Sequence, residues 1–213
     1  MTDARARTRR LIDRHLGLDL RERVGDAYRD PSGTLLEGEW LGAFVQPSVV
    51  LNQVTPVSVR LAGAEGWSID EYGKATLEVA AGDHGRVRWT KRYTPSVARQ
   101  FEYVGRIEGG TLAGYWVSTL RPSFGGVFWL VRADRLPPDI ADRLRARVRR
   151  SSPRRSLLKG LFAVVVLAAA LGIRVFPPLA FATLVPCVVF VVAMRTRTDA
   201  LRHEVERWKR QLG

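Results

Sequence analysis

Residues 101–116 read FEYVGRIEGGTLAGYW, a stretch with the period of two that is typical of β-strands. Aromatic and small residues alternate with charged ones up to the pair Gly109-Gly110. Two consecutive glycines suit a tight two-residue turn, because such turns need positive φ angles. The stretch therefore predicts two antiparallel strands joined by a hairpin turn.

The same period continues in both directions, from residue 35 to residue 133. Segments rich in Val, Trp, Tyr, Phe and Thr are separated by clusters of Gly, Pro or Asn. We expect strands at 36–46, 49–53, 56–62, 74–80, 86–94, 99–107, 111–119 and 126–133. Eight antiparallel strands predict a mainly β domain over 31–136, a small closed, calycin-like barrel without exposed edges. A β-sandwich with the same number of strands is the alternative.

Residues 157–194 form two apolar runs, which are split by Arg174 and the pair Pro177-Pro178. Each run is close to the roughly 20 residues that a helix needs to cross about 30 Å of hydrocarbon. The proline pair cannot continue a helix and suits a turn between two antiparallel spans. The segment predicts a two-helix transmembrane hairpin, with two core helices of a soluble protein as the alternative.

The net charge of +13 is concentrated beside this segment, because residues 136–213 hold 15 Lys and Arg against 5 Asp and Glu. Cationic flanks stay on the cytoplasmic side of a membrane and contact anionic lipid head groups. We expect a multi-pass protein of a bacterial inner membrane, with both termini and the barrel in the cytoplasm and no nucleic acid as a partner. The expected membrane-flanking residues are Arg150, Arg154, Arg155, Lys159, Arg195 and Arg197.

Three basic segments surround the barrel and the hairpin. Residues 1–30 read as an amphipathic helix that lies on the membrane surface or packs on the barrel, and its acidic residues favour packing. Residues 137–156 read as a helical linker. Residues 195–213 read as a cytoplasmic helix with Trp208 at the lipid interface.

Sequence motifs for catalysis are not found. The three histidines lie in different regions, and the single cysteine, Cys187, lies inside the second apolar run. The chain has no Gly-rich phosphate loop and no nucleophile elbow. We therefore expect neither a cofactor nor a metal site, and a protein that is not an enzyme.

The predicted barrel interior is rich in aromatic rings and holds a few cations. The rings could stack a flat ligand, and Lys91, Arg99 or Arg132 could bind a phosphate. The alternative is that the rings form the packed core, although an inward-facing cation is costly unless something pairs with it. The candidate ligand-binding residues are Trp40, Trp89, Lys91, Tyr93, Arg99, Tyr103, Trp116 and Arg132.

The glycine–aromatic strands EWLGAF (39–44), FEYVG (101–105) and LAGYW (112–116), together with the hairpin, carry a resemblance. The chain resembles the two-transmembrane-helix, β-barrel effectors of bacterial anti-phage cyclic-nucleotide signalling, with the order of the two parts reversed. The resemblance implies a barrel that binds a cyclic nucleotide, a protein that oligomerises, and helices that breach the inner membrane.

Three functions follow as expectations. The first is a non-enzymatic membrane effector whose barrel senses a small nucleotide-like ligand and drives oligomerisation of the hairpin. The second is a membrane-anchored, lipocalin-like carrier of a lipid or another apolar molecule, which needs an empty interior. The third is a structural module, a filled barrel whose outer surface docks a partner protein.

Overall fold

The structure is a computed structural model that describes residues 2–16, 36–46, 53–81, 85–94, 100–108, 110–149 and 199–212. Its centre is a closed antiparallel barrel in which each strand pairs with the next along the chain. The strands are β1 (Gly38–Gln46), β2 (Gln53–Ala62), β3 (Glu65–Asp70), β4 (Gly73–Ala81), β5 (Arg86–Tyr93), β6 (Gln100–Glu108), β7 (Thr111–Ser118) and β8 (Gly125–Arg132). Because β1 pairs with both β2 and β8, the sheet has no edge, and the predicted barrel is confirmed over the sandwich.

Glycines allow the strands to approach one another closely inside this small barrel. A Cβ atom added at Gly114 would lie 2.0 Å from the carbonyl oxygen of Val104, and one at Gly126 would lie 1.8 Å from that of Val45. No side chain fits at such distances. The predicted turn between β6 and β7 is also present, since Glu108 pairs with Thr111 and Gly110 has a φ of 69°.

The strand predictions differ from the structure around β2 and β3. Of the strand predicted at 49–53, the structure describes only Gln53, which is the first residue of β2 and not part of a separate strand. Residues 49–52 lie outside the described residues. No strand was expected at β3, whose apolar residues, Trp67 and Ile69, lie between the inward-facing Gly66, Ser68 and Asp70. The expected alternation, apolar inside and polar outside, is inverted there.

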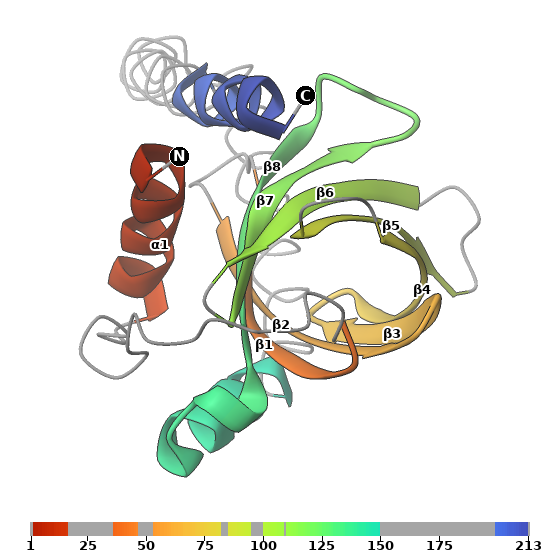
Figure 1. Cartoon of the computed structure of the whole chain (residues 1–213), viewed down its shortest axis with the longest axis vertical. Helices are drawn as coiled ribbons and strands as arrows, with labels where there is room; N and C mark the ends of the chain where they lie inside the picture. The colour runs from red at the N-terminus through yellow and green to blue at the C-terminus, as the bar shows by residue number, and fades with distance from the viewer. Residues whose placement is uncertain are drawn as a thin grey trace, which may run out of the picture.

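One outer wall of the barrel is covered by three helices (Figure 1). They are α1 (Thr2–Leu16) and the helices 138–149 and 199–212. An apolar cluster outside the barrel joins the buried side chains of these helices to outward residues of β1, β7 and β8, such as Leu41, Ala113 and Trp129. The strands β1 and β8 are therefore buried on both faces, whereas β5 alternates between buried and more exposed residues.

The two terminal helices contact each other as well as the barrel. Ile12 of α1 and Val205 and Leu212 of the last helix belong to the same buried cluster. The Trp208 indole Nε1 donates a hydrogen bond of 3.1 Å to Thr8 Oγ1 in a buried position. Packing on the barrel is thus observed for residues 2–16 of the predicted N-terminal helix, and residues 17–30 lie outside the described residues. The placement of Trp208 at a lipid interface is wrong, because its ring is 2% exposed and packs on α1 and the barrel wall.

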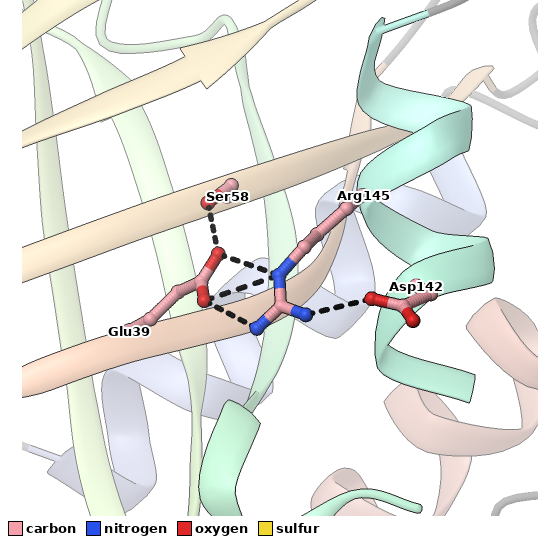
Figure 2. Close-up of polar contacts among 4 residues, drawn as sticks. All are labelled: Glu39, Ser58, Asp142 and Arg145. Atoms are coloured by element: carbon pink, nitrogen blue, oxygen red, sulfur yellow. Dashed lines mark hydrogen bonds and ion pairs between the residues drawn. The ribbon is translucent and has the colours of Figure 1, made fainter. Parts of the chain in front are cut away.

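A charged contact attaches helix 138–149 to the barrel (Figure 2). The Arg145 guanidinium donates to both carboxylate oxygens of Glu39 on β1, with Nη2 to Oε2 at 2.7 Å, and also to Asp142 at 2.9 Å. Ser58 on β2 donates to the same Glu39 carboxylate at 3.2 Å. The hydrogen bonds from Arg145 are the main reason that the pKa of Glu39 is lowered, although burial acts against them. The helix 138–149 is therefore held to β1 through Glu39, whose carboxylate is also bonded to β2.

The predicted hairpin over 157–194 and the flanking residues Arg150, Arg154, Arg155, Lys159, Arg195 and Arg197 lie outside the described residues. Among the helices of the described ranges, none combines the length and the hydropathy that crossing a bilayer requires.

Candidate functional site: a charged cluster inside the barrel

Aromatic side chains from β1, β5, β6, β7 and β8 fill most of the barrel interior. The rings of Trp89 and Tyr103 are stacked, with centroids 5.0 Å apart and planes 11° apart. Phe128 meets the ring of Trp89 edge-on at 5.0 Å, and Phe44 meets Trp116 edge-on at 5.9 Å. Such offset and edge-on pairs are the favoured arrangements of aromatic rings. The interior is a packed core in which the rings contact one another.

A charged pair lies within this aromatic core. Lys91 on β5 is 2% exposed, and its ammonium is bonded to the carboxylate of Asp70, which is 2% exposed. The Tyr93 hydroxyl donates to the same Asp70 oxygen at 2.5 Å, and the backbone N–H of Tyr72 donates to the other at 2.7 Å. The Asp70 carboxylate therefore accepts three hydrogen bonds, which offset part of the cost of burying its charge.

Three rings surround the Lys91 ammonium. Its Nζ atom lies 4.7 Å from the ring centroid of Tyr93, 5.3 Å from that of Phe44 and 5.9 Å from that of Tyr103. These distances are within the roughly 6 Å over which a cation is attracted to a ring face. Burial lowers the pKa of Lys91, and the neighbouring Asp70 carboxylate opposes that shift.

Further polar contacts extend from Asp70 through the β3–β4 turn to the end of the barrel. The Gln46 amide donates to the Tyr72 hydroxyl, and the Thr55 hydroxyl donates to Glu71 at 2.9 Å. Burial is the main cause that raises the pKa of Tyr72 to about 12, and burial also raises the pKa of Tyr93. Both phenols are therefore neutral donors or acceptors at ordinary pH, and together these contacts close the barrel end near β3 and β4.

A small cavity of about 10 Å³ lies in the interior. Its wall is formed mainly by aliphatic and aromatic side chains, with Ser68 and Lys91 also among the lining residues. A volume of this size is about that of one water-sized sphere. In this conformation it has no room for a nucleotide or an acyl chain. The lining residues are Phe44, Val57, Val59, Ser68, Leu77, Trp89, Lys91, Tyr103, Phe128 and Leu130.

The structure brings together only part of the predicted ligand-binding set. Trp89, Lys91, Tyr93 and Tyr103 meet in the interior, and their neighbour Trp116 is fixed by a 3.1 Å hydrogen bond from its indole to the Val45 carbonyl. Trp40 is buried nearer the opposite end, where its indole donates to the Leu36 carbonyl at 3.2 Å.

Of the other two predicted cations, the structure describes only Arg132, which does not lie beside Lys91. Arg132 ends β8 at the far end of the barrel from the β3–β4 turn, and its guanidinium pairs with Asp134 at 2.6 Å. The structure therefore does not bring Arg132 together with Lys91, and a role of Arg132 in ligand binding stays a prediction. Arg99 lies outside the described residues. Lys91 is the one predicted cation that the described structure places in the interior.

Four polar residues of this region were not predicted, namely Gln46, Ser68, Asp70 and Tyr72. A buried lysine requires an acceptor, so the sequence indicated that a partner of Lys91 exists without indicating which carboxylate it is. The available signal was the spacing of Gly66, Ser68 and Asp70, three small or polar residues at every second position before a turn. Residues at every second position of a strand lie on the same face, so this spacing is typical of a strand whose small and polar residues face the interior.

Metal binding has no support within the described ranges, where no group of three or more His, Cys, Asp or Glu side chains could hold an ion. The charged cluster is buried, since Asp70 and Lys91 are each 2% exposed and Tyr93 is 8% exposed. Comparison of the chain with protein-family models, curated proteins and solved structures gives no match.

Proposed function

We propose that this chain is a membrane-anchored, non-enzymatic effector of a bacterial inner membrane. Its barrel holds both ends of a two-helix hairpin over 157–194 and alters the assembly of that hairpin when a small nucleotide-like ligand binds. The observation that carries the proposal is the shared attachment of helices 138–149 and 199–212. Both contribute to the apolar cluster on one barrel wall, through residues such as Leu144 and Leu201.

This attachment constrains the segment between the two helices. The helix that ends at residue 149 and the helix that begins at residue 199 attach to the same barrel wall, so a membrane segment between them would have to cross an even number of times. The two apolar runs separated by Pro177-Pro178 fit two crossings. The same attachment offers a route for a signal, because a shift of the wall strands moves both ends of the hairpin.

The small cavity limits where a ligand can bind. A nucleotide must either displace interior rings or bind at the barrel end that carries Tyr72, Phe101 and Phe124, three rings that are only partly buried. These rings pack edge-on against Tyr93 and Trp116. Stacking of a flat base on them would couple the ligand to the aromatic core. The resemblance to anti-phage effectors extends the proposal to ligand-driven oligomerisation that permeabilises the membrane.

The filled interior favours a second function, a rigid structural module that positions the hairpin and docks a partner protein. This candidate needs no ligand. The lipid carrier is disfavoured, because an acyl chain does not fit a cavity of about 10 Å³.

Thermal unfolding of the full chain in detergent, with its size measured in parallel, separates these functions. Linear and cyclic nucleotides are added singly, and a ligand that binds the folded state raises the melting temperature by mass action. The effector proposal expects one cyclic nucleotide to raise the melting temperature and the oligomer size, and to release dye from vesicles that contain the protein. A panel without any shift contradicts it and favours the structural module. An acyl species that co-purifies would restore the carrier.

A further inference from the structure

The outer face of the β3–β4 pair differs from the wall that the helices cover. Buried side chains of the three helices join residues of β1, β7 and β8, whereas β3 and β4 lie on another side of the barrel (Figure 1). The inverted pattern of β3 turns Trp67 and Ile69 outward, where Trp67 is half-buried and Ile69 is 37% exposed. A strand that faces water on its outer side normally carries polar residues there. The inversion therefore indicates a surface that meets a partner.

Charges of opposite sign lie at the two ends of this face. From the β3–β4 turn to the other end of the two strands, the outward cross-strand pairs are Ile69–Lys74, Trp67–Thr76 and Glu65–Glu78. The Lys74 ammonium lies 5.8 Å from the ring centroid of Trp67, within the range of a cation–π contact. The face therefore has an aromatic centre, a cation at one end and two carboxylates at the other.

This order of charges makes the face complementary to itself. In a two-fold symmetric contact, a residue that touches a second residue of the partner is touched in turn by the same pair in reverse. An axis that runs across the strands, along the Trp67–Thr76 row, places Lys74 of each copy opposite Glu78 of the other. The two Trp67 side chains then meet at the centre. An axis parallel to the strands would instead place carboxylates against carboxylates.

We propose that the outer face of β3 and β4 is a contact surface between two copies of this chain. Buried tryptophans surrounded by a polar rim carry much of the binding energy in such interfaces. Because the outer wall of a closed barrel is convex, β2 and β5 curve away from the contact. The contact goes beyond the proposed ligand response, because it needs neither a nucleotide nor the membrane segment.

Charge reversal tests the facing pair in the full chain, in detergent and without nucleotide. Lys74→Glu and Glu78→Lys each place like charges opposite one another twice, so each variant alone should self-associate about tenfold or more weakly than the parent. An equal mixture of the two variants should restore the dimer, because one copy is then acidic at both positions and the other is basic at both. Analytical ultracentrifugation measures all of these.

Arg88→Glu is the matched control for the change in net charge. Arg88 is exposed on β5, outside the proposed contact, and pairs with Glu102 on β6, so this variant should dimerise like the parent. A parent chain that stays monomeric at every concentration overturns the proposal. A dimer that neither Lys74→Glu nor Glu78→Lys weakens is formed elsewhere and overturns it too, as does a mixture that stays as weak as the single variants. A nucleotide panel without effect contradicts the effector function and leaves these expectations unchanged.

Cysteine cross-linking tests where the axis lies. With Cys187 replaced by serine, Thr76→Cys should form a disulfide-linked dimer on oxidation, because the axis brings position 76 of both copies together. Ala80→Cys is the matched control, since Ala80 is exposed on the same face of β4 but lies beyond the carboxylate end. Equal cross-linking at the two positions would overturn the proposed arrangement.

Discussion

Lys91 is the side chain on which the barrel interior depends most. Its ammonium is bonded to Asp70 and is surrounded by three rings, and the residue is among those that line the interior cavity. Burying such a pair rarely adds net stability relative to an apolar pair, but removing one partner leaves the other charge buried and unpaired. The pair is therefore best tested by comparing single and double substitutions.

We expect Lys91→Met to lower the free energy of unfolding by about 3–5 kcal/mol, because the Asp70 carboxylate loses its cation. The double variant Lys91→Met with Asp70→Asn should recover much of that loss, since no buried charge is left. Arg92→Met is the matched control on the same strand, because its ion pair with Glu78 is exposed and worth about 1 kcal/mol or less. Urea unfolding measures all three. Equal losses for Lys91→Met and Arg92→Met would contradict the buried pair.

Tyr72 should make the stability of the barrel depend on pH in the alkaline range. Its pKa is raised from 10.0 to about 12, chiefly by burial, so the folded state favours the neutral phenol. The resulting stability is complete below pH 10 and is lost as the pH rises from 10 toward 12. The raised pKa of Tyr93 acts in the same direction. In Tyr72→Phe, the free energy of unfolding should fall less steeply above pH 10 than in the parent chain. An unchanged slope would show that Tyr72 is not shifted.

Among the secondary-structure elements, the helix 199–212 links the two ends of the chain. It lies against α1 and the barrel wall (Figure 1), and its Trp208 indole is bonded to Thr8. Apolar packing contributes to holding the helix in place, and the buried hydrogen bond from Trp208 to Thr8 links it to α1. Loosening this contact should affect the helix without unfolding the barrel.

Thr8→Val retains the shape of the side chain and removes the acceptor of the Trp208 N–H. A buried donor without a partner costs about 1–3 kcal/mol, so hydrogen exchange in residues 199–212 should become faster. Exchange within β4 and β5 should stay unchanged. Thr76→Val, on the outer face of β4, is the matched control because its hydroxyl is exposed. Equal exchange in 199–212 for both variants would mean that the indole bond does not hold the helix.

For the molecule as a whole, both helices that flank residues 150–198 attach to one body. Their ends must therefore lie on the same side of any membrane that the segment enters. Labelling of single cysteines, with Cys187 replaced by serine, measures this. Cysteines at the exposed positions Arg143 and Arg202 should react with an impermeant maleimide only after cells are opened, whereas one at Arg174 should react in intact spheroplasts. Reaction of Arg143→Cys and Arg202→Cys on opposite sides would overturn the hairpin.

The barrel was predictable to the extent that its strands alternate. β5 and β6 carry apolar and aromatic residues at every second position, and their bounds lie within one residue of the prediction. β3 was missed because its inward residues are Gly66, Ser68 and Asp70. Its small and polar residues therefore face the interior and its apolar residues face outward, the reverse of the expected pattern. The continuous apolar run of β8, with Val127 to Val131 all buried, signalled that helices cover its outer face.

The order of amino acids alone specifies most of the antiparallel strands, the inward faces of those that alternate, and the presence of a cation on one of these faces. A period of two reports which face a side chain occupies, because that is a local property of the extended backbone. It cannot report which residue lies opposite after the sheet closes. Only the tertiary structure pairs Lys91 with Asp70, 21 positions away, and Trp208 with Thr8, 200 positions away. These contacts arise from closure of the barrel and from helix packing, which join parts of the chain that no local pattern connects.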